Sequence, residues 1–388
     1  MLKIKVIFAF LLLAATLICL PVSSFAGGVS PDDSVAAMLD GISVSAKAAA
    51  VIEASTGQAV YLLNADEELP MASTTKIMTA LVVLDNLDPT QTVTVPAAAV
   101  NTEGSSAYLA VNEEISVKSL LYAMMLQSAN DAAEALALNV SGSIEDFAGL
   151  MNAKAAELGL EHTHFINPHG LDAEDHYTSA SDLAKLTAYA LKNPLFKEIV
   201  STKKYTADDE TAVVSRMFVN HNRLLNEYEG AVGVKTGYTK STGRCLVSAA
   251  ERDGITLIAV TLNDPDDWKD HKKLLDSAFE ICSRVELCKD GSESFEVPVI
   301  NGRSGKVKCV NKGDVTYVSV GQPNDTEKTV EIERFLYAPV SKGERVGRII
   351  YKCGGNVVGE SEIVAVKSVK SISYPSFFDR ILIKLGIK

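Results

Sequence analysis

Residues 70–76 read Pro-Met-Ala-Ser-Thr-Thr-Lys and mark the point where the pattern of the chain changes from strands to helices. Before them, residues 47–53 and 58–63 are two runs of strand-forming residues joined by the turn signal Ser-Thr-Gly, which predicts a β-hairpin. After them, apolar residues recur at helical spacing as far as about Val200. The stretch therefore separates an amino-terminal hairpin from a long helical segment.

Strand patterns return after this helical segment, at residues 231–236, 244–250 and 256–262. The last two are joined by the hairpin turn Glu-Arg-Asp-Gly, and a helix is predicted to follow over residues 266–282. Two early strands and three late ones, separated by helices, fit one antiparallel five-stranded sheet with packed helices better than a parallel β-α-β array. We therefore predict an α+β domain with a helical insert over residues 35–285.

The pattern changes again after Cys288, where short alternating strands are separated by Asn-Gly and Lys-Gly turns. This pattern predicts a small all-β domain over residues 286–366. The strands expected in it include residues 294–299, 306–310, 315–320 and 330–336.

The final segment, residues 367–388, is predicted to form an amphipathic helix that anchors the chain at a membrane surface. Its apolar residues at helical spacing are Phe377, Phe378, Ile381, Leu382 and Leu385, whereas Arg380, Lys384 and Lys388 lie mostly elsewhere. Helices of this character lie in the interface of a bilayer. The alternative is a helix that docks on the small β domain.

The first 26 residues have the pattern of a secretory signal peptide. Lys3 and Lys5 precede a mostly apolar run that is short for a bilayer span, and the small residues Ser24 and Ala26 suit cleavage after Ala26. The alternative is a transmembrane anchor. A signal peptide together with the carboxyl-terminal helix predicts an exported protein at the extracytoplasmic face of the cell membrane.

The charge and the cysteines exclude some classes of partner. The formal net charge is −12 and becomes more negative when the signal peptide is removed, which argues against nucleic acid as a partner. The five cysteines after residue 26 have neither metal-ligand nor Cys-x-x-Cys spacing, so no metal site is predicted. Buried thiols are expected, with a Cys282–Cys288 bridge as the alternative.

Ser73 and Lys76 lie three residues apart at the start of the helical segment, so one turn puts their side chains on the same face. A serine hydroxyl is a poor nucleophile at neutral pH and needs a base. A lysine amine can be that base where burial or a nearby cation disfavours its charge. Alone, the spacing fits equally a helix cap followed by a lysine that faces solvent.

A second motif, Ser-Ala-Asn at residues 128–130, lies between two predicted helices. In such a loop Ser128 could relay a proton, and the amide of Asn130 could hold a substrate carbonyl. The alternative is a helix cap, in which one of these side chains satisfies free backbone N–H groups.

A third motif, Lys-Thr-Gly at residues 235–237, ends a predicted strand. Gly237 would permit a close approach of substrate backbone, and Lys235 would supply positive charge. Taken alone, the motif is an ordinary strand end.

Together the three motifs resemble the signature set of the serine penicillin-binding proteins and class A β-lactamases. Asn-Pro-His-Gly-Leu at 167–171, His-Tyr-Thr-Ser-Ala at 176–180 and Asp-Leu-Ala at 182–184 are further similar to the low-molecular-mass D-alanyl-D-alanine carboxypeptidases of the peptidase S11 family. The resemblance covers the predicted α+β domain, the β-rich domain and, by character only, the final helix. It implies that His169 and His176 belong to a structural loop.

The resemblance implies a role for each motif residue. Ser73 is expected to be the acylated nucleophile, Lys76 its base and Ser128 a proton relay. The expected substrate-binding residues are Asn130, Lys235, Thr236, Gly237 and Tyr238. The backbone N–H groups of Ser73 and Tyr238 would form the oxyanion hole, although some members carry histidine in place of Tyr238. Arg223 is a shifted candidate for binding the terminal carboxylate.

The implied activity is that of a serine D,D-carboxypeptidase that removes the terminal D-alanine from peptidoglycan pentapeptide stems, without a cofactor, and that β-lactams inhibit covalently. One alternative is a class A-like β-lactamase, but no Glu-x-x-Leu-Asn segment for deacylation occurs between Ser128 and Lys235. The other alternative is a weakly active penicillin-binding scaffold.

Overall fold

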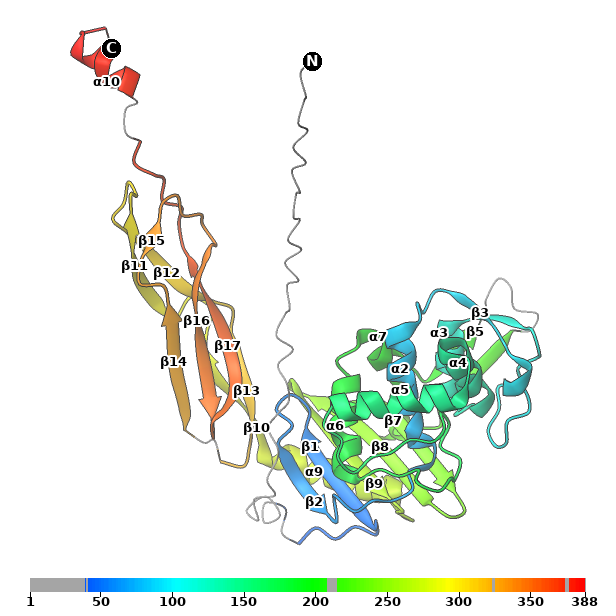
Figure 1. Ribbon diagram of the computed structural model, residues 1–388. Helices are drawn as coiled ribbons and strands as arrows, with labels where there is room; N and C mark the ends of the chain where they lie inside the picture. Colours follow the sequence, from blue (N-terminus) through cyan, green and yellow to red (C-terminus); the bar gives the residue numbers. More distant parts are fainter. Residues whose placement is uncertain (1–38, 40, 208–214, 323–324, 374–376, 388) are drawn as a thin grey trace, which may run out of the picture.

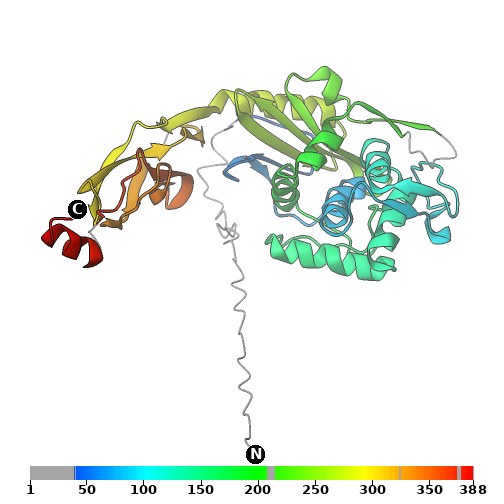
Figure 2. The same cartoon turned by 90° about the horizontal axis from the view of Figure 1, so that it is seen from above.

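The computed structural model describes residues 39, 41–207, 215–322, 325–373 and 377–387. The predicted signal peptide, residues 1–26, lies outside the described residues. Figure 1 shows a first domain in which helices surround a sheet, and an elongated β domain that leads to the carboxyl-terminal helix. The turned view in Figure 2 shows the same two bodies side by side.

The first domain is built on one five-stranded sheet in the order β2-β1-β9-β8-β7, and every neighbouring pair is antiparallel. This confirms the predicted α+β class with an antiparallel sheet. Strand β7 is an edge strand, so one of its sides is open to other groups. The strands are β1 (Ala48–Glu53), β2 (Ala59–Leu63), β7 (Ala231–Thr239), β8 (Gly243–Arg252) and β9 (Ile255–Leu262).

Helices cover both faces of this sheet (Figure 1). On β1, Ala50 and Ile52 pack into the core shared with the helical insert, whereas Val51 packs into the core beneath α9 (Asp267–Ile281). This alternation is what a strand covered on both sides requires. The helical insert contains η1 (Ala72–Thr75), α2 (Lys76–Asn86), η2 (Ala97–Ala99), α3 (Val117–Leu126), α4 (Asn130–Ser141), α5 (Ile144–Glu157), α6 (Ala180–Ala190), α7 (Pro194–Ser201) and, after it, the short α8 (Leu224–Glu227).

Local sequence fixes where several of these helices begin. Ser116, Ser143 and Ser179 each accept a hydrogen bond from a backbone N–H in the first turn of α3, α5 and α6, as N-cap residues do. Two small hairpins were not predicted, because strands of three or four residues have little periodicity to detect. They are β3 (Thr92–Thr94) with β4 (Glu114–Ser116), and β5 (Lys204–Ala207) with β6 (Arg216–Val219).

The β domain begins where α9 ends, without an intervening loop. Strand β10 (Cys282–Cys288) follows Ile281 directly and pairs with β13 (Val315–Val320). Val318 and Val320 of β13 pack into the same core as Leu274 and Ala278 of α9. The two domains therefore share a hydrophobic cluster at their junction.

The remaining strands of the β domain form a six-stranded sheet in the order β14-β16-β17-β12-β11-β15. The all-β character is as predicted, but the longest hairpin was missed, and the strand expected at residues 330–336 is divided between two strands. The strands are β11 (Ser294–Ile300), β12 (Lys306–Lys312), β14 (Thr326–Ile332), β15 (Leu336–Tyr337), β16 (Arg345–Cys353) and β17 (Asn356–Ala365). The five cysteines of the described residues are free thiols.

The segment after β17 differs from the helix expected over residues 367–388. Val369 pairs with Val340 and Ser371 pairs with Gly302, so this part of the segment lies on the β domain. The helix α10 (Phe377–Lys384) follows. In the part of the chain that the structure describes, no helix has both the length and the apolar character needed to cross a membrane.

Candidate functional site

Ser73 lies in η1, the single turn that precedes α2, and is half-buried. Lys76 is the first residue of α2 and is completely buried. The Nζ atom of Lys76 is 3.0 Å from the Oγ atom of Ser73. The predicted juxtaposition of hydroxyl and amine is therefore present.

Two other groups fix the orientation of the Lys76 amine. Its Nζ donates to the side-chain oxygen of Asn130 at 2.7 Å and to the backbone carbonyl of His169 at 2.6 Å. Burial lowers the pKa of Lys76 well below its usual value, and the nearby charge of Lys235 lowers it further. A neutral amine has two N–H bonds and one lone pair. In this neutral form the two acceptors would take the two N–H bonds and the lone pair would face Ser73, whereas in the ammonium form the third N–H bond is donated to the Ser73 hydroxyl.

Ser128 lies in the short connection between α3 and α4, and Asn130 is the first residue of α4. Ser128 has a positive φ of 61°, which is uncommon for a residue other than glycine. The side-chain amide of Asn130 donates to the carbonyl of Glu103 at 2.5 Å, and its backbone N–H donates to Ser105 at 2.7 Å. These bonds leave the side-chain oxygen of Asn130 pointing at Lys76.

Lys235 lies on β7, where it is buried and contacts Ser128. Its Nζ donates to the hydroxyl of Ser128 at 3.1 Å and to the carbonyl of Thr236 at 2.9 Å. Burial lowers the pKa of Lys235 to about 7. Two buried amines thus flank the Ser128–Asn130 connection, one beside Ser73 and one on the edge strand.

Gly237 lies where β7 meets η1. A Cβ atom at Gly237 would lie 3.1 Å from the carbonyl oxygen of Met71 and 3.2 Å from the backbone nitrogen of Ser73, so a side chain there would crowd the turn that carries the hydroxyl. Thr236 is half-buried, and the side chain of Tyr238 is 66% exposed. The structure therefore gathers all three predicted motifs, with Tyr238 at the outer rim.

His169 and His176 have structural hydrogen bonds. The Nδ1 atom of His169 accepts from the backbone N–H of Leu171 at 3.1 Å, so its proton is on Nε2, which faces Glu134 at 3.2 Å. Nδ1 of His176 likewise accepts from Ile166. Burial lowers the pKa of His176 to about 4, so this ring is neutral near pH 7.

Sequence reasoning missed two contributors to the site, the backbone carbonyl of His169 and the carboxylate of Glu134. Glu134 accepts from the hydroxyl of Thr102 at 2.8 Å as well as facing His169. It lies four residues after Asn130 on α4, so the helical spacing was a signal that could have pointed to it. Arg223 binds Glu227 at 3.0 Å and lies over the ring of Trp268, and neither contact involves a motif residue.

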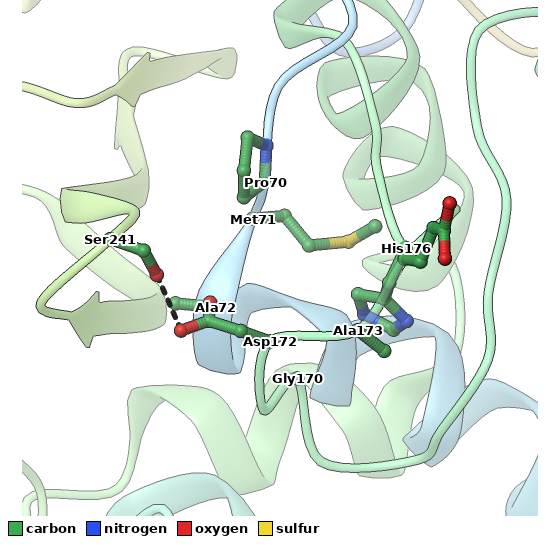
Figure 3. A pocket seen from close by; sticks show the side chains of 9 residues that line it. Pro70, Met71, Ala72, Gly170, Asp172, Ala173, His176 and Ser241 are labelled. Carbon is green, nitrogen blue, oxygen red and sulfur yellow. Dashed lines mark hydrogen bonds between the residues drawn. The ribbon is translucent and has the colours of Figure 1, made fainter.

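A cavity of about 310 Å³ lies on the Met71–Ala72 side of η1 (Figure 3). The carboxylate of Asp172 lies at its edge and accepts hydrogen bonds from the hydroxyls of Thr239, Ser241 and Thr242. Asp172 thereby joins the loop that carries His169 to the turn after β7.

Comparison with known proteins places both domains in families. The family model of peptidase S11, described as D-alanyl-D-alanine carboxypeptidase, matches residues 33–266, and the model of the penicillin-binding protein 5 C-terminal domain matches residues 283–371. D-alanyl-D-alanine carboxypeptidase DacF of Bacillus subtilis (strain 168) is 33% identical over 347 residues, which are 86% of this chain and 88% of that protein. A D-alanyl-D-alanine carboxypeptidase of Streptomyces sp. (strain K15) is 41% identical over 223 residues, 53% of this chain and 77% of that one.

Solved structures have the same architecture. Penicillin-binding protein 5 from Haemophilus influenzae superposes with a TM-score of 0.63 at 27% identity, and the match covers 85% of this chain and 99% of that one. This structural match covers 85% of the chain, and the two family models together match residues 33–266 and 283–371, so the similarity includes both domains. The chain belongs to the peptidase S11 family of D-alanyl-D-alanine carboxypeptidases and carries, after its α+β domain, the C-terminal domain of penicillin-binding protein 5.

Proposed function

We propose that this chain is a serine D,D-carboxypeptidase that removes the terminal D-alanine from peptidoglycan pentapeptide stems through an acyl-enzyme on Ser73. The observation that carries the proposal is the orientation of Lys76. Its two N–H bonds meet acceptors at Asn130 and His169, so its lone pair faces a hydroxyl 3.0 Å away. A neutral, oriented amine of this kind is a general base for serine.

Acylation begins when the Ser73 hydroxyl proton passes to Lys76 and the Oγ atom bonds to the carbonyl carbon of the penultimate D-alanine. The backbone N–H groups of Ser73 and Tyr238 stabilise the resulting oxyanion. The packing of Gly237 against the backbone of Ser73 supports this pairing, because it holds β7 directly against η1.

Collapse of the intermediate breaks the bond between the carbonyl carbon and the nitrogen of the terminal D-alanine. Ser128, which accepts a hydrogen bond from Lys235, passes its hydroxyl proton to that nitrogen and takes in its place the proton that Lys76 removed from Ser73, so Lys76 is neutral again. The positive charge of Lys235, together with Thr236, holds the substrate, and Asn130 positions its peptide. Water then attacks the ester and gives a proton to Lys76, the bond between the acyl carbon and the Oγ atom of Ser73 breaks, and Lys76 returns the proton to Ser73 as the shortened stem leaves.

A β-lactam forms the same ester, but its leaving nitrogen stays tethered to the acyl group and blocks the path of water. A stable adduct is therefore expected. In a class A-like β-lactamase a loop glutamate would activate that water. Here the loop residues 167–171 present the carbonyl of His169 to Lys76, and the nearby Glu134 is engaged by His169 and Thr102. The geometry favours the carboxypeptidase.

The proposal includes the place of action. A signal peptide over residues 1–26 exports the chain, and α10 with the residues after it holds the enzyme at the outer face of the cytoplasmic membrane. The sequence of this tail supports the proposal, because apolar residues alternate with Arg380, Lys384 and Lys388 at helical spacing.

Release of D-alanine from diacetyl-L-Lys-D-Ala-D-Ala by the purified chain tests the activity. Wild type should release D-alanine and Ser73→Ala should not, whereas Ser201→Ala, which changes a serine at the end of α7, should behave as wild type. Intact mass after exposure to benzylpenicillin should show one adduct, mapped to Ser73. Rapid turnover of the penicillin would favour the β-lactamase, and an adduct without D-alanine release would favour the scaffold.

A further inference from the structure

Three segments meet at the end of the β domain from which the carboxyl-terminal tail departs. Tyr337 of β15 pairs with Ile300 at the end of β11. The backbone N–H of Ile372 donates to Asn301, and that of Arg303 donates to Lys370, both at 2.8 Å. Figure 1 shows β15 and β11 at this end of the β domain, with α10 beyond them. The first domain and the junction with β10 lie at the opposite end of the β domain.

Large apolar side chains are exposed where these segments meet. Ile300 is 40% exposed, Phe335 46%, Tyr337 64% and Ile372 42%. The rings of Phe335 and Tyr337 lie edge to face, with their centres 5.5 Å apart. Single exposed hydrophobic residues need no explanation, but a cluster contributed by three segments marks an interaction site.

Arg303 and Lys370 are exposed in the same segments, and among the described residues no carboxylate forms an ion pair with either. We call Ile300, Phe335, Tyr337 and Ile372, together with these two cations, the distal patch. Aromatic rings beside unpaired cations are the combination that favours the headgroup region of an anionic bilayer. The hollow that Phe335 and Tyr337 line also has the charged residues Glu331, Glu333, Arg334, Arg345 and Arg348 in its lining, so it is not a groove for an apolar peptide.

The distal patch is close to α10 along the chain. Phe377 is five positions after Ile372, and five residue steps span at most about 18 Å even when fully extended. A surface bound by α10 therefore lies within reach of the patch. A second, linked contact gains affinity because the first one raises its effective concentration.

We propose that the distal patch is a second membrane contact, in which Phe335 and Tyr337 enter the interface and Arg303 and Lys370 bind anionic lipid headgroups. The inference rests on the proposed anchoring role of α10. Two contacts at one end of the β domain would fix the orientation of the elongated domain on the membrane. The first domain, at its other end, would then be held away from the lipid and toward the cell wall.

Binding of the full mature chain, residues 27–388, to vesicles of phosphatidylcholine with and without phosphatidylglycerol tests this proposal. Phe335→Ser with Tyr337→Ser should weaken binding about tenfold or more on both kinds of vesicle. Arg303→Gln with Lys370→Gln should weaken it about tenfold on anionic vesicles and little on neutral ones. Tyr337→Trp should bind at least as tightly as wild type.

Matched changes at the other end of the β domain serve as controls. Val357→Ser and Lys312→Gln alter an exposed apolar residue and an exposed cation there and should not change binding. Unchanged binding by both patch variants would overturn the proposal, as would equal losses in the controls. All variants should release D-alanine from a soluble peptide as wild type does, which separates this test from that of the activity. If deletion of residues 374–388 leaves binding unchanged, the anchor is wrong but the patch result still stands by itself.

Discussion

Two lysines without a direct carboxylate partner define the chemistry of the site at the scale of single residues. Lys76 and Lys235 are both buried, and each contacts one of the polar side chains of the 128–130 connection. Burial lowers both pKa values, and the charge of Lys235 lowers that of Lys76 further. The pair can therefore hold one neutral amine and one ammonium at the same pH, which supplies a base and an anion-binding charge together.

A change of Lys235 to arginine should alter the pH dependence of acylation. The reaction needs Lys76 neutral and Lys235 charged, and the pKa of Lys235 is lowered to about 7. The rate should therefore fall as pH rises through this value, because Lys235 loses its proton. A guanidinium keeps its charge, so Lys235→Arg should move the alkaline limb upward by about one pH unit or more. The position of the alkaline limb is measured by stopped-flow acylation with a fluorescent penicillin over roughly pH 5 to 10.

Lys204→Arg is the control, since Lys204 is exposed on β5 and should leave the profile unchanged. An alkaline limb at the same pH in Lys235→Arg and wild type would show that some other group titrates there.

Glu134 should act on the site through His169. Glu134→Ala leaves the buried Nε2–H of His169 without its acceptor, which costs about 1–3 kcal/mol of unfolding free energy. The backbone carbonyl of His169 orients Lys76, so a displaced His169 should slow acylation about tenfold. Glu134→Gln keeps an acceptor oxygen, so it should retain most of the unfolding free energy and most of the acylation rate. Denaturant unfolding and acylation rates measure these effects, and a loss of stability without any loss of rate would limit Glu134 to a structural role.

The side chains that meet at the site could be predicted from the sequence, whereas its main-chain acceptor, the carbonyl of His169, could not. Ser73, Lys76, Asn130 and Lys235 carry functional groups that only a few residue types have, so their spacing is informative. The carbonyl of His169 is a group that every residue has, and its position depends on the path of the loop rather than on the identity of the side chain.

At the scale of elements, the loop that carries His169 fits against η1 through Gly170. Gly170 has a φ of +87°, and a Cβ atom there would lie 1.9 Å from the carbonyl oxygen of Ala72. Asp172 joins the other end of this loop to the turn after β7. The loop, η1 and β7 are thus held together on three sides of Ser73.

Gly170→Ala should displace this loop. The substitution adds an unfavourable φ to a backbone clash, so the unfolding free energy should fall by at least about 2 kcal/mol and acylation should slow at least about a hundredfold. Gly149→Ala is the matched control, because Gly149 lies within α5 with open space around it, and alanine there should stabilise by about 0.5–1 kcal/mol. Chemical denaturation and penicillin acylation measure both variants. A Gly170→Ala protein that acylates normally would refute the close fit.

The strands that sequence missed lack the pattern that identifies strands. β16 has register shifts at two places along its pairing with β17, and each shift interrupts the alternation of inward and outward residues. Only the end of β14 lay within the strand expected over residues 330–336, because β14 is an edge strand whose residues are all at least partly exposed and form no buried apolar face. The central strands β1 and β9 of the first domain were found because burial on both faces gives them nearly continuous apolar runs.

For the whole molecule, the shared cluster at the junction determines whether the domains behave independently. Val318 and Val320 of the β domain are buried with Leu274, Leu275 and Ala278 of α9, and the backbone N–H of Gly321 donates to Ile281 at 2.8 Å. Because α9 also covers the central sheet, unfolding of the β domain would expose part of the core of the first domain. Cooperative unfolding of the two domains is the expected consequence.

Removal of the two valine side chains from this cluster should uncouple the domains. Val318→Ala with Val320→Ala should give two transitions in differential scanning calorimetry where wild type gives one, with the lower transition destabilised by about 2 kcal/mol or more. Val330→Ala, on the exposed face of β14, should leave the single transition in place. D-alanine release from a soluble peptide should be unchanged in both variants, because the junction makes no contact with Ser73 or Lys76. Two transitions already present in wild type would mean that the shared cluster does not couple the domains, and the orientation of the first domain above a membrane would then depend on the wall rather than on the β domain.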